Sequence, residues 1–165
     1  MRGGVRLGVD VGKARIGVAR SDFHGMLATP VETVQRDHES ETDLTRICDI
    51  AAELEAFEIV VGLPLNLRGE RTLSTDDATG FADRLAVRLA PAGIRIRLVD
   101  ERLSTVSAQG QLRQAGKKTK QSRSIIDQAA AVVILQHALD SERAQGAAPG
   151  TVVDAGTPDE EEMNA

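Results

Sequence analysis

Residues 5–12 alternate between two kinds of position, and this alternation constrains the fold more than any other feature of the chain. Four apolar residues, Val5, Leu7, Val9 and Val11, alternate with Arg6, Gly8, Asp10 and Gly12. A period of two predicts a β-strand with two distinct faces. A second apolar run, residues 15–20, follows the Gly12 turn, and a third predicted strand spans residues 26–34. We therefore expect three consecutive antiparallel strands.

The remainder of the chain alternates predicted helices and strands. Residues 59–63 form a continuous apolar run, as expected for a central strand covered on both faces. Helices are predicted where a Ser-x-x-acid capping pattern precedes apolar residues at helical spacing, as after Ser40 and Ser74. The predicted order after the third strand is helix 40–56, strand 59–63, helix 74–89, strand 94–99, helix 104–115 and helix 124–139. This order predicts an α/β fold with a mixed five-stranded sheet and helices on both faces.

Charge and composition divide the chain at about residue 140. Residues 141–165 contain six acidic side chains and one arginine, which accounts for the whole net charge of −5. We expect residues 1–140 to form one domain and residues 141–165 to be an acidic, disordered tail. The domain itself is electrically neutral, so the charge of the whole chain does not argue against a nucleic-acid partner. With three Phe and no Trp or Tyr, the chain lacks the aromatic platforms on which single strands stack.

The only cysteine, Cys48, fits a reducing compartment, since it has no partner within the chain for a disulfide. It shares helical spacing with Leu44, Ile47 and Ala51, which predicts that it packs in the core, with a disulfide between chains or a reactive thiol as the alternatives. No apolar stretch is long enough to span a membrane and no signal peptide is evident. A cytoplasmic protein is therefore expected.

Acidic residues lie at the edges of three elements that are far apart in the sequence. Asp10 is near the end of the first strand, Asp100 and Glu101 follow the strand at 94–99, and Asp127 opens the last helix. Carboxylates gathered in this way can bind Mg²⁺ or Mn²⁺ and support hydrolysis of phosphodiesters. By strand alternation Glu101 falls on the face opposite Asp100, with Val99, and we favour Glu101 as the ligand and keep Asp100 as an auxiliary candidate. We expect the face shared by Gly8 and Asp10 to leave room for a ligand.

Each acid also has an ordinary structural explanation. Asp10 could accept backbone hydrogen bonds in the Gly12 turn, and Asp100 and Glu101 could form a solvated strand end paired with Arg102. Asp127 is the last residue of a Ser-x-x-acid capping box, where a negative charge suits the helix dipole in any protein.

Basic residues are placed where they could contact phosphates. Residues 102–126 contain six cationic side chains and no acid. Together with two residues at the glycine turn and one in the loop after residue 63, the candidates for nucleic-acid binding are Lys13, Arg15, Asn66, Arg102, Arg113, Lys117, Lys118, Lys120 and Arg123. A run of like charge can also be a solvated surface, and Asn66 could simply cap a turn.

Four segments, read together, resemble the signature blocks of the YqgF/RuvX family. They are Gly8 to Ala19, Val61 to Asn66, Asp100 to Thr105 and Ile126 to Ala131, and the resemblance covers residues 5–139. It implies a ribonuclease H-like fold and a metal-dependent nuclease. The family is associated with maturation of the 5′ end of the small-subunit ribosomal RNA precursor and with resolution of four-way (Holliday) DNA junctions. Resolution requires two symmetric nicks, which would favour a homodimer.

The resemblance also implies a catalytic and metal-binding set of Asp10, Glu101 and Asp127. The chain departs from the related RuvC-type resolvases at Gly62-Leu63-Pro64, where those enzymes carry a catalytic acid. Asp100 or Glu101 would have to replace that acid. RuvC-type helices also tend to carry a further acid near the position of Asp127, which this helix lacks.

Two other classes of protein remain open. The strand, Asp, glycine turn and strand from Val9 to Gly17 also resemble the phosphate-binding hairpin of actin, sugar-kinase and Hsp70-type ATP-binding domains, although those proteins pair two such domains. The second alternative is a nucleic-acid or ribosome-assembly binding module that keeps the fold without turnover. Cleavage in the presence of metal would separate the nuclease from both.

Overall fold

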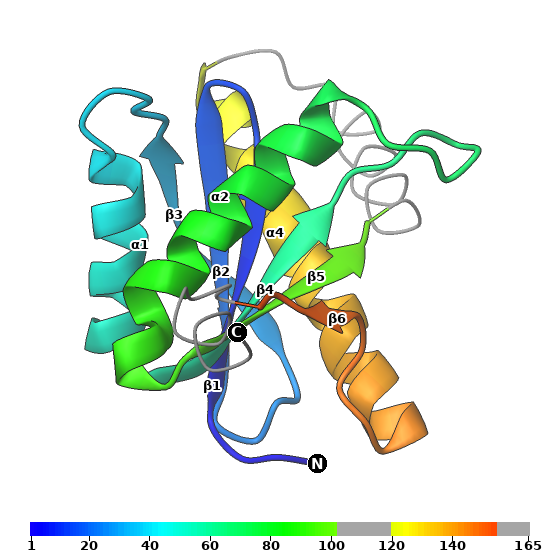
Figure 1. The fold of residues 1–165 in the computed structure, drawn as a ribbon. Coiled ribbons are helices and arrows are strands. Elements are labelled where there is room, and N and C mark those ends of the chain that lie inside the picture. Colours follow the sequence, from blue (N-terminus) through cyan, green and yellow to red (C-terminus); the bar gives the residue numbers. More distant parts are fainter. Residues whose placement is uncertain (102–119, 155–165) are drawn as a thin grey trace, which may run out of the picture.

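The computed structural model describes residues 1–101 and 120–154 of the chain, which form a twisted mixed β-sheet with helices on both faces (Figure 1). The strands are β1 (Val5–Val11), β2 (Arg15–Ser21), β3 (Ala28–Gln35), β4 (Ala56–Leu63), β5 (Arg95–Asp100) and β6 (Thr151–Val152). The helices are α1 (Thr42–Glu53), α2 (Leu73–Leu89), the 3₁₀ turn η1 (Ala90–Ala92) and α4 (Lys120–Gln145). The helix predicted at 104–115 and the loop predicted at 117–121 lie wholly or largely outside the described residues.

Strand pairing follows the predicted mixture of directions. The order across the sheet is β3-β2-β1-β4-β5-β6. Strands β1, β2 and β3 pair antiparallel, whereas β4 pairs parallel with both β1 and β5. The expected three antiparallel strands followed by parallel strands are confirmed, but the sheet has six strands in the described residues rather than five. The sixth, β6, pairs antiparallel with β5 at the edge.

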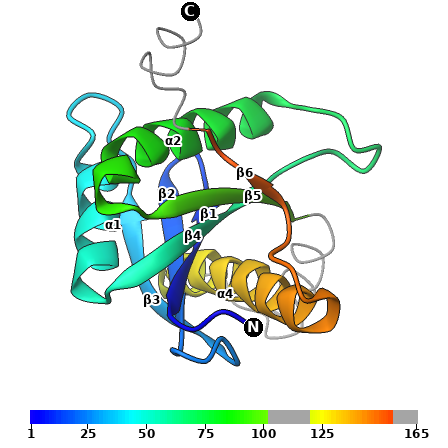
Figure 2. The same cartoon turned by 60° about the horizontal axis from the view of Figure 1, so that its bottom comes forward.

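The helices enclose the sheet in two layers (Figure 2). Helices α1 and α2 cover one face, and α4 crosses the other. The larger apolar cluster lies under α1 and α2 and includes Leu7, Val9, Ile59 and Phe81, all fully buried. The smaller cluster lies under α4 and contains Ala19, Ala28, Val60, Val99, Ala131, Ile134, Leu135, Ala138 and Leu139. Cys48 is partly buried and packs against the larger cluster, as its helical spacing predicts.

Helix α4 packs directly on the backbone of the sheet because one face of β1 and β2 carries glycines. A Cβ atom added to Gly8 would lie 2.6 Å from Cβ of Leu135 and 2.9 Å from the carbonyl oxygen of Ala131. The space beside Gly8 is therefore filled by the helix, and the expectation that it is open for a ligand is wrong at that position. Close packing of a helix on glycine backbone explains the missing side chain instead.

The predicted start of a disordered tail at residue 141 is too early. Helix α4 continues to Gln145, and Glu142 is buried. Its carboxylate accepts hydrogen bonds from Arg2, at 2.7 Å, and from the buried Arg6, at 3.2 Å. The guanidinium of Arg2 also binds Glu58 on β4, at 2.8 Å. Because Arg2 and Arg6 are more than 130 positions from Glu142 along the chain, the local composition around Glu142 could not reveal these contacts. Residues 155–165 lie outside the described part.

Two observed helix starts differ from the predicted ones. Helix α1 begins at Thr42 and ends at Glu53, and its N-cap residue, Glu41, makes no side-chain capping hydrogen bond. The carboxylate of Asp37 accepts the backbone N–H groups of Glu39, Ser40 and Thr42 in the turn that leads into the helix. Helix α2 begins at Leu73 because Thr72 and Thr75 form a capping box. Along the described segments, no helix combines the length and the apolar character needed to cross a membrane.

Candidate active site

Asp10 lies near the end of β1 with its side chain on the face covered by α4. On one side, Asp10 is paired in register with Gly17 of β2. On the other, the parallel pair Val9–Val61 places Gly62 of β4 beside it, one residue further along. Asp10 therefore stands between two glycines, and each glycine leaves space for a group from another part of the chain.

The space over Gly17 is occupied by Asp127. A Cβ atom on Gly17 would overlap the backbone carbonyl of Asp127 in the N-terminal part of α4. The carboxylates of Asp127 and Asp10 are near enough to repel each other. Burial, together with this repulsion, raises the pKa of Asp10 to about 6. Two acids that are separated by more than a hundred residues in sequence are thus neighbours.

The space over Gly62 is occupied by Glu101. A Cβ atom on Gly62 would overlap Oε2 of Glu101 and would lie 2.7 Å from Cδ1 of Ile134 on α4. The backbone N–H of Glu101 donates to the carbonyl of Leu63 at 3.3 Å, which holds the residue beside the end of β4. Glu101 therefore reaches over the position where the sequence has Gly62-Leu63-Pro64 instead of an acid. Asp100, at the end of β5, is exposed.

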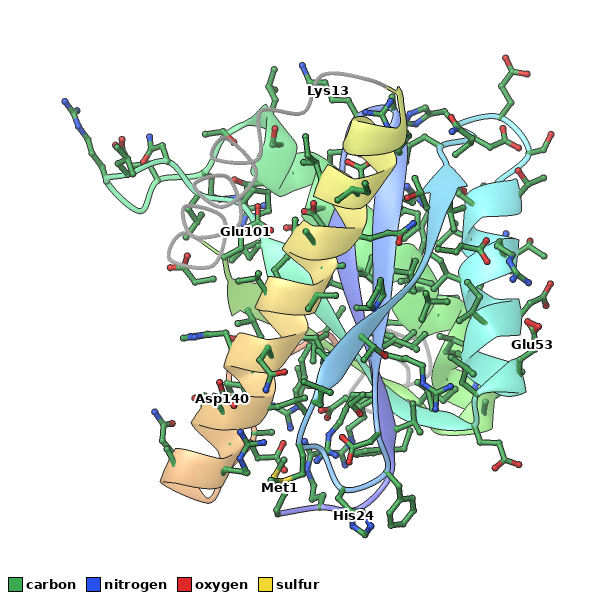
Figure 3. The ribbon with its side chains drawn as sticks, turned by 180° about the vertical axis from the view of Figure 1, so that it is seen from behind. Met1, Lys13, His24, Glu53, Glu101 and Asp140 are labelled. Atoms are coloured by element: carbon green, nitrogen blue, oxygen red, sulfur yellow. The ribbon has the colours of Figure 1, made fainter. Side chains whose placement is uncertain are left out.

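These placements show on which face of the sheet Asp100 and Glu101 lie. Glu101 lies on the α4 face with Asp10, and Asp100 does not, as alternation along β5 predicts. In Figure 3, Glu101 lies beside the upper half of α4, on the side of the molecule where Lys13 also lies, whereas Met1 and His24 lie at the opposite end. The structure thus brings Asp10 and Asp127 together and places Glu101 one strand away from Asp10, across Gly62.

The three acids do not form a closed cage. Among residues 1–101 and 120–154, no group of three His, Cys, Asp or Glu side chains is arranged so that it could hold a metal ion without further movement. At Asp127, Nε of Arg15 donates to Oδ2 at 2.8 Å. The guanidinium of Arg15 therefore binds a carboxylate that the sequence predicts to be a metal ligand.

The residues predicted to contact nucleic acid differ in where they lie and in what they bind. Lys13 is exposed at the turn between β1 and β2, and Arg15 is engaged with Asp127. Asn66 caps its own loop, since its Oδ1 accepts the backbone N–H groups of Arg68 and Glu70, both at 2.9 Å. Four more candidates, Arg102, Arg113, Lys117 and Lys118, lie outside the described residues. Lys120 and Arg123 belong to the first turns of α4, but their side chains are not described.

Sequence analysis missed the role of Gly17 and Gly62, and the pairing of Arg15 with Asp127. The available signal was a glycine in the middle or at the end of an apolar strand, which indicates close approach of another segment.

A contact from outside the hairpin holds the turn at Gly12 between β1 and β2. Arg36 on the segment after β3 donates to the carbonyl of Gly12 at 2.8 Å and to Asp77 on α2 at 2.8 Å.

Gly62→Ala tests whether the missing side chain makes room for Glu101. The new methyl group would displace the Glu101 carboxylate, which is a side chain and can move, so we expect the free energy of unfolding to fall by no more than about 1–2 kcal/mol. Any activity that depends on Glu101 should fall at least tenfold. Thermal unfolding and a cleavage assay measure the two effects. Retention of full activity would show that the position of the Glu101 carboxylate is unimportant.

Comparison with known proteins places these observations in a family. The family described as "RuvX: Holliday junction resolvase" matches residues 4–141. A protein of Clavibacter sepedonicus named "Putative pre-16S rRNA nuclease" is 61% identical over 153 residues, which is 93% of each chain. A protein of Leifsonia xyli subsp. xyli with the same name is 56% identical over 154 residues, covering 93% of this chain and 97% of its own.

Solved structures support the fold assignment. Thermus thermophilus RuvC has a TM-score of 0.54 and 16% identity, covering 90% of this chain and 99% of RuvC. RuvC from the same organism in complex with a Holliday junction substrate has a TM-score of 0.57 and 13% identity, covering 91% and 99% of the two chains. The ribonuclease H-like fold expected from the sequence is confirmed. With four ordered sequence blocks, the matching fold and these relatives, the chain belongs to the RuvX family.

Proposed function

We propose that this protein is an endonuclease that hydrolyses phosphodiester bonds in structured nucleic acid with Mg²⁺ or Mn²⁺, and that Asp10, Glu101 and Asp127 are its metal ligands and catalytic residues. One observation carries the proposal. Asp10 lies between two strand glycines, and each admits a further acidic residue, Asp127 over Gly17 and Glu101 over Gly62. Ordinary core packing gives no reason to collect three carboxylates on one buried face.

The donor set suits a hard divalent cation. Carboxylate oxygens are the preferred protein ligands of Mg²⁺ and Mn²⁺, and a cation would offset both the burial and the repulsion from Asp127 that raise the pKa of Asp10. When bound, such an ion supplies activation of the attacking water and stabilisation of the leaving oxygen. Asp10 would provide an oxygen from β1 and Asp127 one from α4. Glu101, which follows β5, would provide an oxygen over Gly62.

The relatives suggest two substrates. The similar proteins named for pre-16S rRNA favour an RNA precursor, whose trimming needs one active site in each event. The description of the family and the RuvC fold favour a four-way DNA junction as a second candidate. Resolution of a junction would in addition need two copies of the chain. We propose the RNA precursor first because the relatives with that name share more than half of their residues with this chain.

Phosphate contacts are proposed for the basic residues near the site. Lys13 is exposed on the same side of the molecule as Glu101 (Figure 3). The basic residues at 102, 113, 117, 118, 120 and 123 lead in sequence directly to Asp127. Neutralising several phosphates would make binding decrease steeply with salt concentration.

A cleavage assay on both substrates tests this proposal. Purified protein is incubated with a 5′-extended small-subunit rRNA fragment or a four-way DNA junction, in Mg²⁺, Mn²⁺ or EDTA. We expect cleavage only with a divalent ion. Glu101→Gln should reduce the rate by about 10³-fold, whereas the matched change Asp100→Asn, on the exposed neighbour, should reduce it less than threefold.

The opposite outcomes are equally clear. If neither substrate is cleaved with either metal while both are bound, the binding-module alternative is correct. If Asp100→Asn is the damaging variant and Glu101→Gln is not, the ligand has been assigned to the wrong neighbour.

A further inference from the structure

The ion pair between Arg15 and Asp127 engages one of the three proposed metal ligands. Arg15 opens β2, Asp127 belongs to α4, and the two are 112 positions apart in sequence. Nε of Arg15 donates to Oδ2 of Asp127 at 2.8 Å, and the two side chains are 29% and 18% exposed. The guanidinium therefore lies against the carboxylate of Asp127, the acid that repels Asp10, and it remains partly accessible to solvent.

The backbone around this pair is held by contacts that do not involve the arginine side chain. The carbonyl of Arg15 accepts the backbone N–H of Gly12 at 2.9 Å, which closes the turn between β1 and β2. The backbone of Asp127 is held against Gly17. Arg15 can therefore leave Asp127 by rotation of its own side chain, without any shift of the sheet or of the helix.

A guanidinium and a divalent cation are alternatives at this carboxylate. Both are cations that bind carboxylate oxygen, and two cations in contact with the same oxygen would repel each other strongly in a partly buried site. Arg15 also forms charge-assisted hydrogen bonds well with phosphate oxygens, because its fork of donors matches them. If Arg15 leaves Asp127, the nearest new anion would be the phosphate of a bound nucleic acid.

We infer that Arg15 is a positioning residue that occupies Asp127 in place of the metal ion and is transferred to a substrate phosphate when a divalent ion binds. This inference rests on the proposed function. It is drawn from the direct contact between Arg15 and one of the three acids. It also makes metal binding and nucleic-acid binding support each other, because the metal releases the arginine that the phosphate needs.

The first test measures the binding of Mn²⁺ in the absence of nucleic acid. Electron paramagnetic resonance reports the concentration of free Mn²⁺. Arg15→Gln should bind Mn²⁺ about five- to thirtyfold more tightly than the unmodified protein, since a competing charge has been removed. Arg20→Gln is the matched control, because it makes the same substitution at the opposite end of β2, and it should change the affinity less than twofold. Arg15→Gln combined with Asp127→Asn should lose the gain, because Arg15 acts through Asp127.

The second test is binding of a labelled four-way junction and of a labelled rRNA fragment in Ca²⁺ or EDTA. Ca²⁺ should raise the affinity of the unmodified protein at least fivefold, and this increment should disappear in Arg15→Gln. Arg15→Lys should keep part of it, since lysine retains the charge without the fork of donors. Arg15→Lys also provides the measurement if the glutamine variant does not fold.

A purely structural ion pair predicts different results. In that case Arg15→Gln lowers the thermal stability and binds Mn²⁺ as weakly as the unmodified protein or more weakly, and this outcome overturns the inference. A third outcome separates the two proposals. If the unmodified protein cleaves its substrate but Arg15→Gln does not change the Mn²⁺ affinity, the nuclease proposal stands and the inference about Arg15 fails. If the unmodified protein does not bind Mn²⁺ at all, both fail.

Discussion

Asp10→Asn should reduce cleavage of the substrate by at least about 10³-fold while it makes the metal-free protein more stable. The loss follows because Asp10 is the carboxylate between Asp127 and Glu101, so an amide at that position would remove a charged ligand from the centre of the site. The gain in stability follows from burial. In the folded protein the pKa of Asp10 is about 6, above its ordinary value of 3.8.

The sign of the stability effect depends on pH. A carboxyl group whose pKa is raised by folding is penalised when it ionises, so the penalty is absent below about pH 4, grows between pH 4 and 6, and is complete above pH 6. Its size is at most about 3 kcal/mol at pH 8. In EDTA, we expect Asp10→Asn to melt several degrees above the unmodified protein at pH 8 and at the same temperature near pH 4.

Thermal unfolding across this pH range and a parallel cleavage assay check the prediction. Asp49→Asn makes the same change on the exposed side of α1 and should affect neither quantity. Cleavage by Asp10→Asn within tenfold of the unmodified rate would contradict the assignment of Asp10. Equal melting temperatures at pH 8 would show that Asp10 carries little penalty in the folded state.

Gly17→Ala should cause the largest loss of stability of any single methyl group added near the site. The new Cβ would overlap the backbone carbonyl of Asp127, and a carbonyl in a helix can move only if the helix moves. Helix α4 packs on β1, β2 and β3, so its displacement would also loosen the smaller apolar cluster. We expect the free energy of unfolding to fall by about 2–4 kcal/mol. Cleavage should fall as well, because Asp127 would be displaced from Asp10.

Gly80→Ala is the control for this prediction. Gly80 lies inside α2, and a Cβ there would make only an ordinary contact, 3.8 Å from Nη1 of Arg84. Alanine is the better helix former, so this variant should be more stable by about 0.5–1 kcal/mol. Urea unfolding of the two variants measures the difference. If Gly17→Ala were as stable as Gly80→Ala, the close packing of α4 on β2 would be wrong.

The sequence predicted those parts of the fold whose cause is local. Alternation from Val5 to Val11 defined β1 and its two faces, and the same rule separated Glu101 from Asp100 at the end of β5. The apolar run inside β4 was correctly placed at the centre of the sheet. Each of these features depends on residues that are neighbours in the sequence.

Features that depend on distant partners were not predictable in this way. The end of α4 was placed too early because Glu142 opens a segment rich in acidic residues, although Arg2 and Arg6 neutralise it. Strand β6 has only two residues and gains its definition from β5. Gly8 suggested space for a ligand, but α4 fills that space. The partner of Arg15 was missed for the same reason, since nothing near it in sequence indicates Asp127.

The ion pairs of Arg2 have a consequence for synthesis of the protein on the ribosome. The second residue of the chain is held by Glu142, near the end of α4, and Asp10 faces the helix that begins at Lys120. Neither contact can form before α4 has been synthesised and has left the exit tunnel. A nascent chain that still lacks α4 would therefore leave Arg2 without Glu142 and would expose the sheet residues of the smaller apolar cluster to water.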